Sequence, residues 1–228
     1  MFDSMSARKA DEAAAGAVPS AGEYGGVGHH GQLYRAAKRM LDVIIATTAI
    51  IILIPAFVVL AVLVRLDSPG PILFRQRRTG LNGRVFRILK FRTMSVIEDC
   101  DAVSHATRND PRVTRLGDFL RKSSLDEMPQ LFNVILGHMS LVGPRPHALA
   151  HDAQYSALLP HYGQRFAVRP GLTGLAQVKG FRGEIHKLDC MAKRVDADIE
   201  YVKSWSIRSD IVILFQTIPL ILRRVNAY

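Results

Sequence analysis

The longest apolar segment of the chain runs from Val43 to Val64 and contains no charged residue. At about 1.5 Å per residue, a straight helix of this length would reach about 33 Å, enough to cross a hydrocarbon core of about 30 Å. Basic residues flank the segment on both sides: Arg35, Lys38 and Arg39 before it, and Arg65, Arg75, Arg77 and Arg78 after it. Because basic flanks favour the cytoplasmic side of a membrane, a single crossing would place one cluster on the wrong side.

Pro55 lies near the middle of this apolar segment. Proline removes one backbone hydrogen bond of a helix and clashes with the carbonyl four residues earlier, so a bend is expected there. A helix bent at Pro55 would enter one leaflet and return, which keeps both basic flanks on one side. The pattern therefore favours a re-entrant (monotopic) membrane helix-turn-helix over residues 34–66, with an ordinary membrane span as the alternative.

A basic β-hairpin is predicted after the membrane segment. Residues 72–78 and 85–91 have the composition of strands, and Asn82-Gly83 between them is a hairpin signal. The hairpin carries seven cations: Arg75, Arg77, Arg78, Arg84, Arg87, Lys90 and Arg92. Such charge suits a solvated sheet edge, or, beside a membrane segment, a surface that faces lipid headgroups or phosphates.

The rest of the chain predicts more helices than strands. Helices are expected over residues 116–121, 126–137 and 191–205. Residues 211–222 are apolar but too few to span a bilayer, so they are expected on the membrane surface or in the core. The fold class is therefore α/β mixed and mostly helical. Residues 1–33 are expected to be a disordered tail, and 67–228 to form one cytoplasmic domain with membrane-surface helices.

The net charge of the chain limits the classes of molecule that it is expected to bind. There are 30 Lys and Arg against 20 Asp and Glu, a net charge of +10. Such a surplus suits nucleic acid, anionic lipid or phosphorylated substrates, and the apolar segment favours the last two. Aromatic residues make up 7% and do not interleave with basic ones as in stretches that stack on bases, so no nucleic-acid partner is expected. Cys100 and Cys190 have no metal or redox spacing and are expected to be reduced thiols.

The segment 123–130, of sequence SSLDEMPQ, is the strongest candidate for chemistry. Pro129 fits only in the first turn of a helix, which predicts Asp126 and Glu127 at a helix start. Helix capping is the ordinary reason for acidic residues there. A helix start also stabilises an incoming phosphate, and Arg121 lies just upstream. The neighbouring cations therefore favour an active site over a simple cap.

Arg145 lies between two prolines in the sequence Gly143-Pro144-Arg145-Pro146. A stiff Pro-Arg-Pro backbone would fix a guanidinium at a diphosphate, which arginine holds with two parallel hydrogen bonds. A plain turn in a solvated loop is the alternative. Two carboxylates near several cations suit phosphoryl transfer, where one acts as nucleophile and either can hold Mg²⁺. Because adjacent residues do not share a helix face, the two are expected to differ in role.

Five blocks of the sequence resemble the bacterial initiating sugar transferases, the monotopic polyprenyl-phosphate hexose-1-phosphate transferases of exopolysaccharide synthesis. The blocks are residues 89–94 (LKFRTM), 120–133 (LRKSSLDEMPQLFN), 140–146 (SLVGPRP), 169–178 (RPGLTGLAQV) and 198–206 (DIEYVKSWS). They occur in the order of that family, and the resemblance covers about residues 34–222.

The resemblance implies a reaction and roles for residues. A hexose-1-phosphate passes from a UDP-sugar to polyprenyl (undecaprenyl) phosphate, with release of UMP and a requirement for Mg²⁺. Asp126 matches the nucleophile of the family, which forms a phosphosugar-enzyme intermediate and so implies ping-pong kinetics. Glu127 matches its partner, a Mg²⁺ ligand or proton handler. Four further residues match polar positions of the family's active site and are the expected substrate and phosphate contacts: Lys90, Arg121, Arg145 and Asp198.

Residues 180–184, of sequence GFRGE, resemble a version seen in glucose-1-phosphate transferases, which favours UDP-glucose, with UDP-galactose as the alternative. The expected location is the bacterial inner (cytoplasmic) membrane, with anionic lipid as a further partner and the catalytic domain facing the cytoplasm. Oligomerisation is left open. The rival function is a membrane-tethered basic protein that binds lipid or nucleic acid without catalysis, but it gives no reason for Asp126-Glu127 beside arginines.

Overall fold

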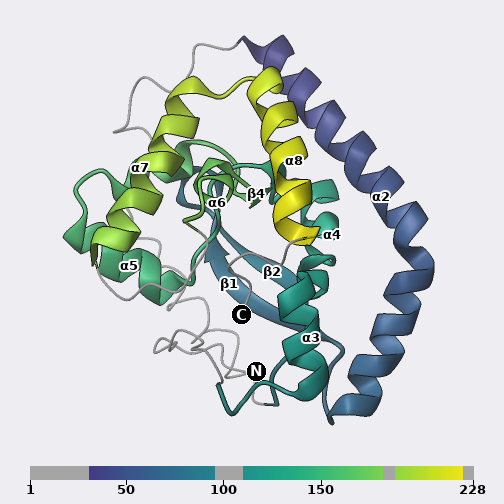
Figure 1. Cartoon of the computed structure of the whole chain (residues 1–228). Helices are drawn as coiled ribbons and strands as arrows, with labels where there is room; N and C mark the ends of the chain where they lie inside the picture. Colours follow the sequence, from purple (N-terminus) through teal and green to yellow (C-terminus); the bar gives the residue numbers. More distant parts are fainter. Residues whose placement is uncertain (1–30, 96–109, 182–187, 223–228) are drawn as a thin grey trace, which may run out of the picture.

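The computed structural model describes residues 31–95, 110–181 and 188–222 (Figure 1). The expected tail lies outside these ranges up to residue 30, and so do residues 182–184 of the GFRGE segment. Over the described ranges the protein is mostly helical and has two small two-stranded sheets, so the mostly helical α/β class is confirmed.

Helix α2, Gln32–Asp67, is one continuous helix of 36 residues with Pro55 inside it. Figure 1 shows it bowed along one side of the molecule, with the rest of the domain on its inner side. No turn interrupts it, so the expected helix-turn-helix is wrong: the segment is a single curved helix that tolerates the one backbone hydrogen bond lost at Pro55. Among the described residues, this helix alone is long and apolar enough to cross a membrane by length and composition. Its outer face exposes large apolar side chains, including Ile44, Ile51, Ile52, Ile54, Val58, Val59 and Val62.

The predicted hairpin is confirmed. Strand β1 (Leu73–Thr79) pairs with β2 (Val85–Phe91) in antiparallel register from Leu73↔Phe91 to Thr79↔Val85. The connecting 3₁₀ turn η2, Leu81–Gly83, places Asn82 at φ 56° and Gly83 at φ 75°. Asn and Gly tolerate this left-handed conformation better than other residues, which is why the pair predicts a turn.

The cations of the hairpin do not form one surface. Arg75, Arg84 and Arg87 are exposed, as a solvated or headgroup-facing edge requires. Arg92 is only 4% exposed and donates to the carbonyl of Val64 at 3.3 Å, at the end of α2. Lys90 also turns inward. The sequence left a solvated edge and a lipid- or phosphate-facing surface open for these cations. The structure divides them between two faces, because the alternation of a strand sends its side chains to opposite faces.

The segment that follows contains one confirmed helix and one correction. Helix α3 is Arg115–Ser123, close to the predicted 116–121. The predicted helix over 126–137 is wrong in its first turn: the 3₁₀ turn η3 spans Leu125–Glu127, and α4 (Gln130–Ile135) begins only after Pro129. Proline has no N–H to continue a helix ladder, so the chain breaks into two short elements there.

Two Gly-Pro segments lie side by side in a way that the sequence did not indicate. Strand β3 (Ser140–Val142) pairs in parallel with β4 (Gly171–Thr173). A Cβ on Gly143 would lie 2.3 Å from the carbonyl oxygen of Arg169, and one on Gly171 would lie 2.1 Å from the amide of Gly143. Only glycine permits this backbone-to-backbone contact.

The remaining elements complete the domain around this pair. They are α5 (Leu149–Leu158), η4 (Tyr162–Ala167), α6 (Leu175–Val178), α7 (Leu188–Ser204) and α8 (Ile207–Leu222). Helix α7 confirms the helix predicted over 191–205. The start of α8 lies beside the start of α2 (Figure 1), where the backbone N–H of Ile207 donates to the Tyr34 hydroxyl at 2.6 Å. Helix α8 buries Ile213 in the core, as one of the two alternatives expects, and exposes Phe215 by 69%.

Both ends of α2 pack on this same domain. Near its start, Lys38 Nζ lies 2.7 Å from a carboxylate oxygen of Asp210 and 2.7 Å from Ser140 Oγ. Near its end, Leu60 and Val64 are buried in an apolar cluster with Phe91 and Leu120. The domain therefore holds the two ends of the apolar helix on one body.

Candidate active site

Glu127 is the hydrogen-bonded centre of the site. Lys90 Nζ, from β2, donates to Glu127 Oε1 at 2.8 Å. Arg145, in the loop after β3, donates through Nη1 to Oε2 at 3.1 Å and through Nη2 to Oε1. Arginine thus holds the carboxylate with both arms of its fork. The structure brings together Lys90, Asp126, Glu127 and Arg145, as predicted, from three separate segments of the chain.

The Asp126 carboxyl lies next to Glu127 in η3 and is 8% exposed. Burial is the largest influence on its pKa and raises it to about 6, although the charges of Lys90, Arg121 and Arg145 act in the opposite direction. Within the described part of the chain, no hydrogen bond ties this carboxylate to a neighbour. The group is nevertheless mostly ionised at neutral pH, as expected of a nucleophile.

The helix start that the sequence predicted at Asp126 is absent, because η3 has three residues and no helix dipole of consequence. Cationic side chains alone oppose the cost of burial. Burial also lowers the pKa of Lys90, while Glu127 raises it. The two carboxylates and the two cations therefore depend on one another, as buried charges must.

The other two predicted site residues stand apart from this group. Arg121, in the last turn of α3, acts on Asp126 through its charge. Asp198, on α7, is 1% exposed and accepts from Arg165 Nε at 2.8 Å rather than contacting Lys90, Glu127 or Arg145. Its link to the site is indirect, because Arg165 Nη2 donates to the carbonyl of Arg145 at 2.6 Å.

Sequence reasoning missed a second, fully buried polar group behind the site. It contains Arg165, His147, Asp152 and Tyr162, with Tyr162 donating to Asp152 at 2.6 Å. Asp198 and Arg165 are 33 residues apart in sequence. No periodicity links residues that far apart, so only the fold could reveal the pair.

The donor set fits a magnesium ion shared with substrate. No group of three or more His, Cys, Asp or Glu side chains suited to a metal is found among the described residues. Mg²⁺ usually keeps several waters and is held by one or two carboxylates together with substrate phosphates. The adjacent carboxylates of Asp126 and Glu127 suit this kind of site, and no protein-only cage is present in the described ranges.

An apolar groove of about 760 Å³ lies between the second half of α2, the start of β1 and the start of α4. Its lining includes Phe57, Ala61, Ile72, Phe91 and Phe132. Pro129 also lines it, two residues after Glu127. An apolar surface that belongs partly to the long apolar helix α2 therefore comes close to the buried acid pair.

The buried acid pair held by Lys90 and Arg145 thus lies beside an apolar groove on the long helix α2. The chain belongs to the bacterial sugar transferase family, whose model matches residues 33–224. The resemblance seen in the sequence is thereby confirmed.

Several relatives are similar over most of this chain. It is 51% identical over 191 residues to the UDP-glucose:undecaprenyl-phosphate glucose-1-phosphate transferase of Caulobacter vibrioides, covering 84% of this chain and 72% of that protein. A protein of the same name from Escherichia coli is 49% identical over 184 residues, covering 81% and 40%. The exopolysaccharide production protein PSS of Rhizobium leguminosarum bv. phaseoli is 44% identical over 195 residues, covering 84% and 98%. The chain thus spans less than half of the Escherichia coli protein.

Proposed function

We propose that this protein transfers glucose-1-phosphate from UDP-glucose to undecaprenyl phosphate and releases UMP, as the first membrane step of exopolysaccharide synthesis. The observation that carries the proposal is the buried Asp126-Glu127 pair held by Lys90 and Arg145. It is supported by the 49–51% identity to proteins named for this reaction. UDP-galactose is the alternative donor.

In this proposal Asp126 is the nucleophile. Its carboxylate oxygen bonds to the phosphorus next to the sugar, the bond from that phosphorus to the UMP oxygen breaks, and a phosphosugar ester remains on Asp126. An oxygen of the lipid phosphate then displaces Asp126, which leaves as a carboxylate. The order is ping-pong, because the first product leaves before the second substrate reacts.

The residues around Asp126 have different roles in the proposed reaction. Arg145 and Lys90 hold the Glu127 carboxylate and add positive charge where the diphosphate must lie. Asp126 and Glu127 would hold Mg²⁺, which when bound neutralises diphosphate charge and assists departure of UMP. The groove beside Pro129 offers apolar surface to the chain of the lipid acceptor.

Release of UMP across a panel of UDP-sugars tests the proposal. With undecaprenyl phosphate and Mg²⁺ present, UDP-glucose should give the fastest release, and a chelator should stop it. If UDP-galactose gave the fastest release, UDP-galactose rather than UDP-glucose would be the donor. If no UDP-sugar yields UMP under these conditions, while the protein still binds vesicles, the rival binding function would stand instead.

Arg145→Lys should lower kcat/KM at least about tenfold, equivalent to about 1.4 kcal/mol of transition-state stabilisation. Lysine keeps the charge but cannot hold both oxygens of Glu127. Arg87→Lys is the matched control, because Arg87 is an exposed arginine of the hairpin. If Arg145→Lys showed near-normal kinetics, the alternative that residues 143–146 form a plain turn with no part in the reaction would be correct.

We also infer that α2 is re-entrant in the bacterial inner membrane, with the catalytic domain in the cytoplasm. Support comes from the two ends of α2, which pack on one domain through Lys38 and through Leu60 and Val64. A helix that crossed the bilayer would have to release one of these ends. The exposed apolar face between the ends, on the outer side of the bow, is the part suited to one leaflet.

Single cysteines on either side of α2 test this topology. In a chain with Cys100 and Cys190 replaced by serine, we expect Gln32→Cys and Asn82→Cys both to resist an impermeant thiol reagent in intact cells and both to react after lysis. Both positions are exposed. Labelling of one position alone in intact cells would establish a membrane span. Pro55→Ala should shift the helix toward spanning, because it restores the missing backbone hydrogen bond.

A further inference from the structure

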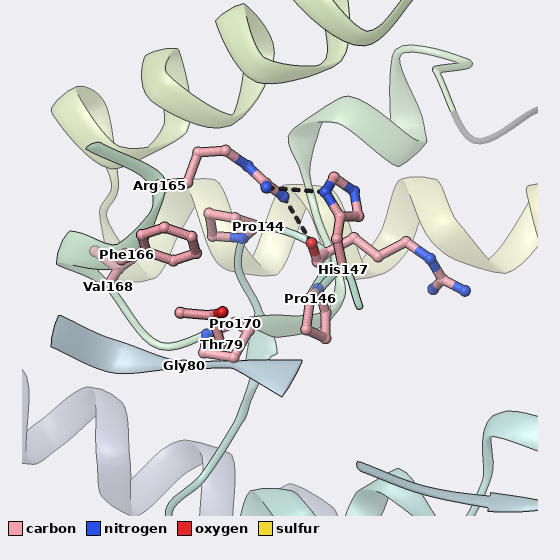
Figure 2. A pocket seen from close by; sticks show the side chains of 10 residues that line it. Thr79, Gly80, Pro144, Pro146, His147, Arg165, Phe166, Val168 and Pro170 are labelled. Carbon is pink, nitrogen blue, oxygen red and sulfur yellow. Dashed lines mark hydrogen bonds between the residues drawn. The ribbon is translucent and has the colours of Figure 1, made fainter. Parts of the chain in front are cut away.

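The loop that carries Arg145 rests on the buried guanidinium of Arg165, whose side chain is 2% exposed (Figure 2). Each type of nitrogen on this guanidinium has its own partner. Nε donates to Asp198 Oδ2 at 2.8 Å, Nη1 lies 3.0 Å from His147 Nδ1, and Nη2 donates to the carbonyl oxygen of Arg145 at 2.6 Å. Figure 2 shows the last two contacts as dashed lines from one fork.

These contacts fix directions as well as distances. His147 Nδ1 also lies 2.7 Å from the Tyr162 hydroxyl, so the imidazole is held between the guanidinium and the phenol. Burial and the neighbouring arginines lower the pKa of His147 well below its usual range, which keeps this imidazole neutral. Asp198 supplies the counter-charge of Arg165. The fork therefore points at the Arg145 carbonyl from a fixed plane.

Holding the Arg145 carbonyl in place also sets the direction of the Arg145 side chain. Pro144 and Pro146 restrict the backbone on both sides of this residue. The carbonyl of Pro146 also accepts from Arg78 Nη1, at 3.4 Å. When the backbone is held at the carbonyl and cannot rotate freely, the direction in which the side chain leaves is set. That direction leads to both oxygens of Glu127.

We propose that Arg165 is a positioning residue of the transferase site: it holds the Arg145 carbonyl and thereby aims the Arg145 guanidinium at Glu127, without touching substrate. The proposal rests on the proposed function for its kinetic readout. It assigns Asp198 the task of orienting Arg165, in place of the substrate contact that the sequence suggested.

A double-mutant cycle between Arg165→Lys and Arg145→Lys tests this coupling. Lysine keeps the buried charge of Arg165 but has no fork for three acceptors. We expect Arg165→Lys to lower kcat for UMP release about tenfold, and the double variant to be no more than about twofold slower than Arg145→Lys alone. A double variant slowed by the product of the two single effects would overturn the proposal, and so would an Arg165→Lys enzyme within about twofold of wild type.

Arg169→Lys is the matched control. Arg169 Nε also donates to a backbone carbonyl, that of Gly137 at 3.0 Å, but it lies outside the Arg145 loop. The control should leave UMP release unchanged and should combine additively with Arg145→Lys. If Arg165→Lys does not fold, the same cycle is run with Asp198→Asn, which keeps the size of the side chain and removes the charge that orients Arg165. Non-additivity is again the expected result, and additivity again overturns the proposal.

A second readout does not depend on the reaction. Phenylglyoxal modifies accessible guanidinium groups, and mass spectrometry of peptides reports the rate at Arg145. We expect Arg165→Lys to speed modification of Arg145 several-fold, because the guanidinium leaves Glu127, whereas Arg169→Lys has no effect. An unchanged rate contradicts the positioning role. A wild-type protein that released no UMP would overturn the proposed function alone, since this rate would still report on Arg165.

Discussion

Asp126→Asn should abolish turnover and yet leave a protein at least as stable as the wild type. Asparagine keeps the size of the side chain but cannot attack phosphorus as an anion. Burial already raises the pKa of Asp126 to about 6, so the fold favours a neutral group at this position. At neutral pH the wild-type protein bears the cost of the buried charge, and the variant does not. If activity is lost and stability is not, Asp126 contributes to the reaction and not to the stability of the fold.

Intact-protein mass spectrometry gives the decisive measurement. After incubation with UDP-glucose and Mg²⁺ but no lipid acceptor, the wild type should carry a hexose-phosphate adduct and Asp126→Asn should carry none. Asp118→Asn is the control, since Asp118 is an exposed aspartate of α3 paired with Lys122. An adduct on the Asp126→Asn protein, or one that maps to another residue, would overturn the ping-pong mechanism proposed above.

Glu127→Gln should lower UMP release at least about a hundredfold, equivalent to about 2.7 kcal/mol, and should also lower stability. The variant leaves Lys90 and Arg145 without the carboxylate that both contact. Hydrogen bonds to charged groups contribute about 1.5–3 kcal/mol, so the free energy of unfolding should fall by at least about 1 kcal/mol. The pKa of Lys90, which burial lowers and Glu127 raises, should fall further.

Glu200→Gln separates this effect from the loss of any Lys–Glu pair. Glu200 pairs with Lys179, and their side chains are 55% and 40% exposed. Such surface pairs contribute about 0–1 kcal/mol, so this control should keep both its stability and its activity. Urea unfolding and UMP release on both variants make the comparison. If Glu127→Gln matched Glu200→Gln in both measurements, Glu127 would have no special part in the site.

The elements that the sequence predicts well are those governed by local rules. Strand β2 occupies the predicted residues because Asn82-Gly83 fixes the turn and alternation fixes the register. The predicted start of the 126–137 helix is wrong because Pro129 has no N–H with which to continue a helix. The chain therefore forms the 3₁₀ turn η3 and then α4, rather than one helix. The seven hairpin cations looked alike in sequence, yet Lys90 and Arg92 are inside because they have partners elsewhere in the fold.

The candidate site follows the same division. Asp126, Glu127 and Arg145 could be singled out because their motifs carry chemistry within a few residues. That Arg145 would meet Glu127 directly could not be foreseen, since 18 residues separate them. The role of Arg165 could not be predicted from the sequence at all. Its three partners lie on two other segments of the chain, and none of them forms a sequence pattern with it.

The parallel pairing of β3 with β4 also sets the order in which the site can form on a growing chain. Ser140 donates to the carbonyl of Pro170, and Gly143 donates to that of Thr173, both at 2.9 Å, so the Arg145 loop is held by residues made about thirty positions later. A ribosome adds about 5–20 residues per second, which separates the two segments by seconds. Helix α2, made earliest, is complete well before Gly171 emerges. The loop that carries Arg145 can therefore be held in place only after α2 has been made.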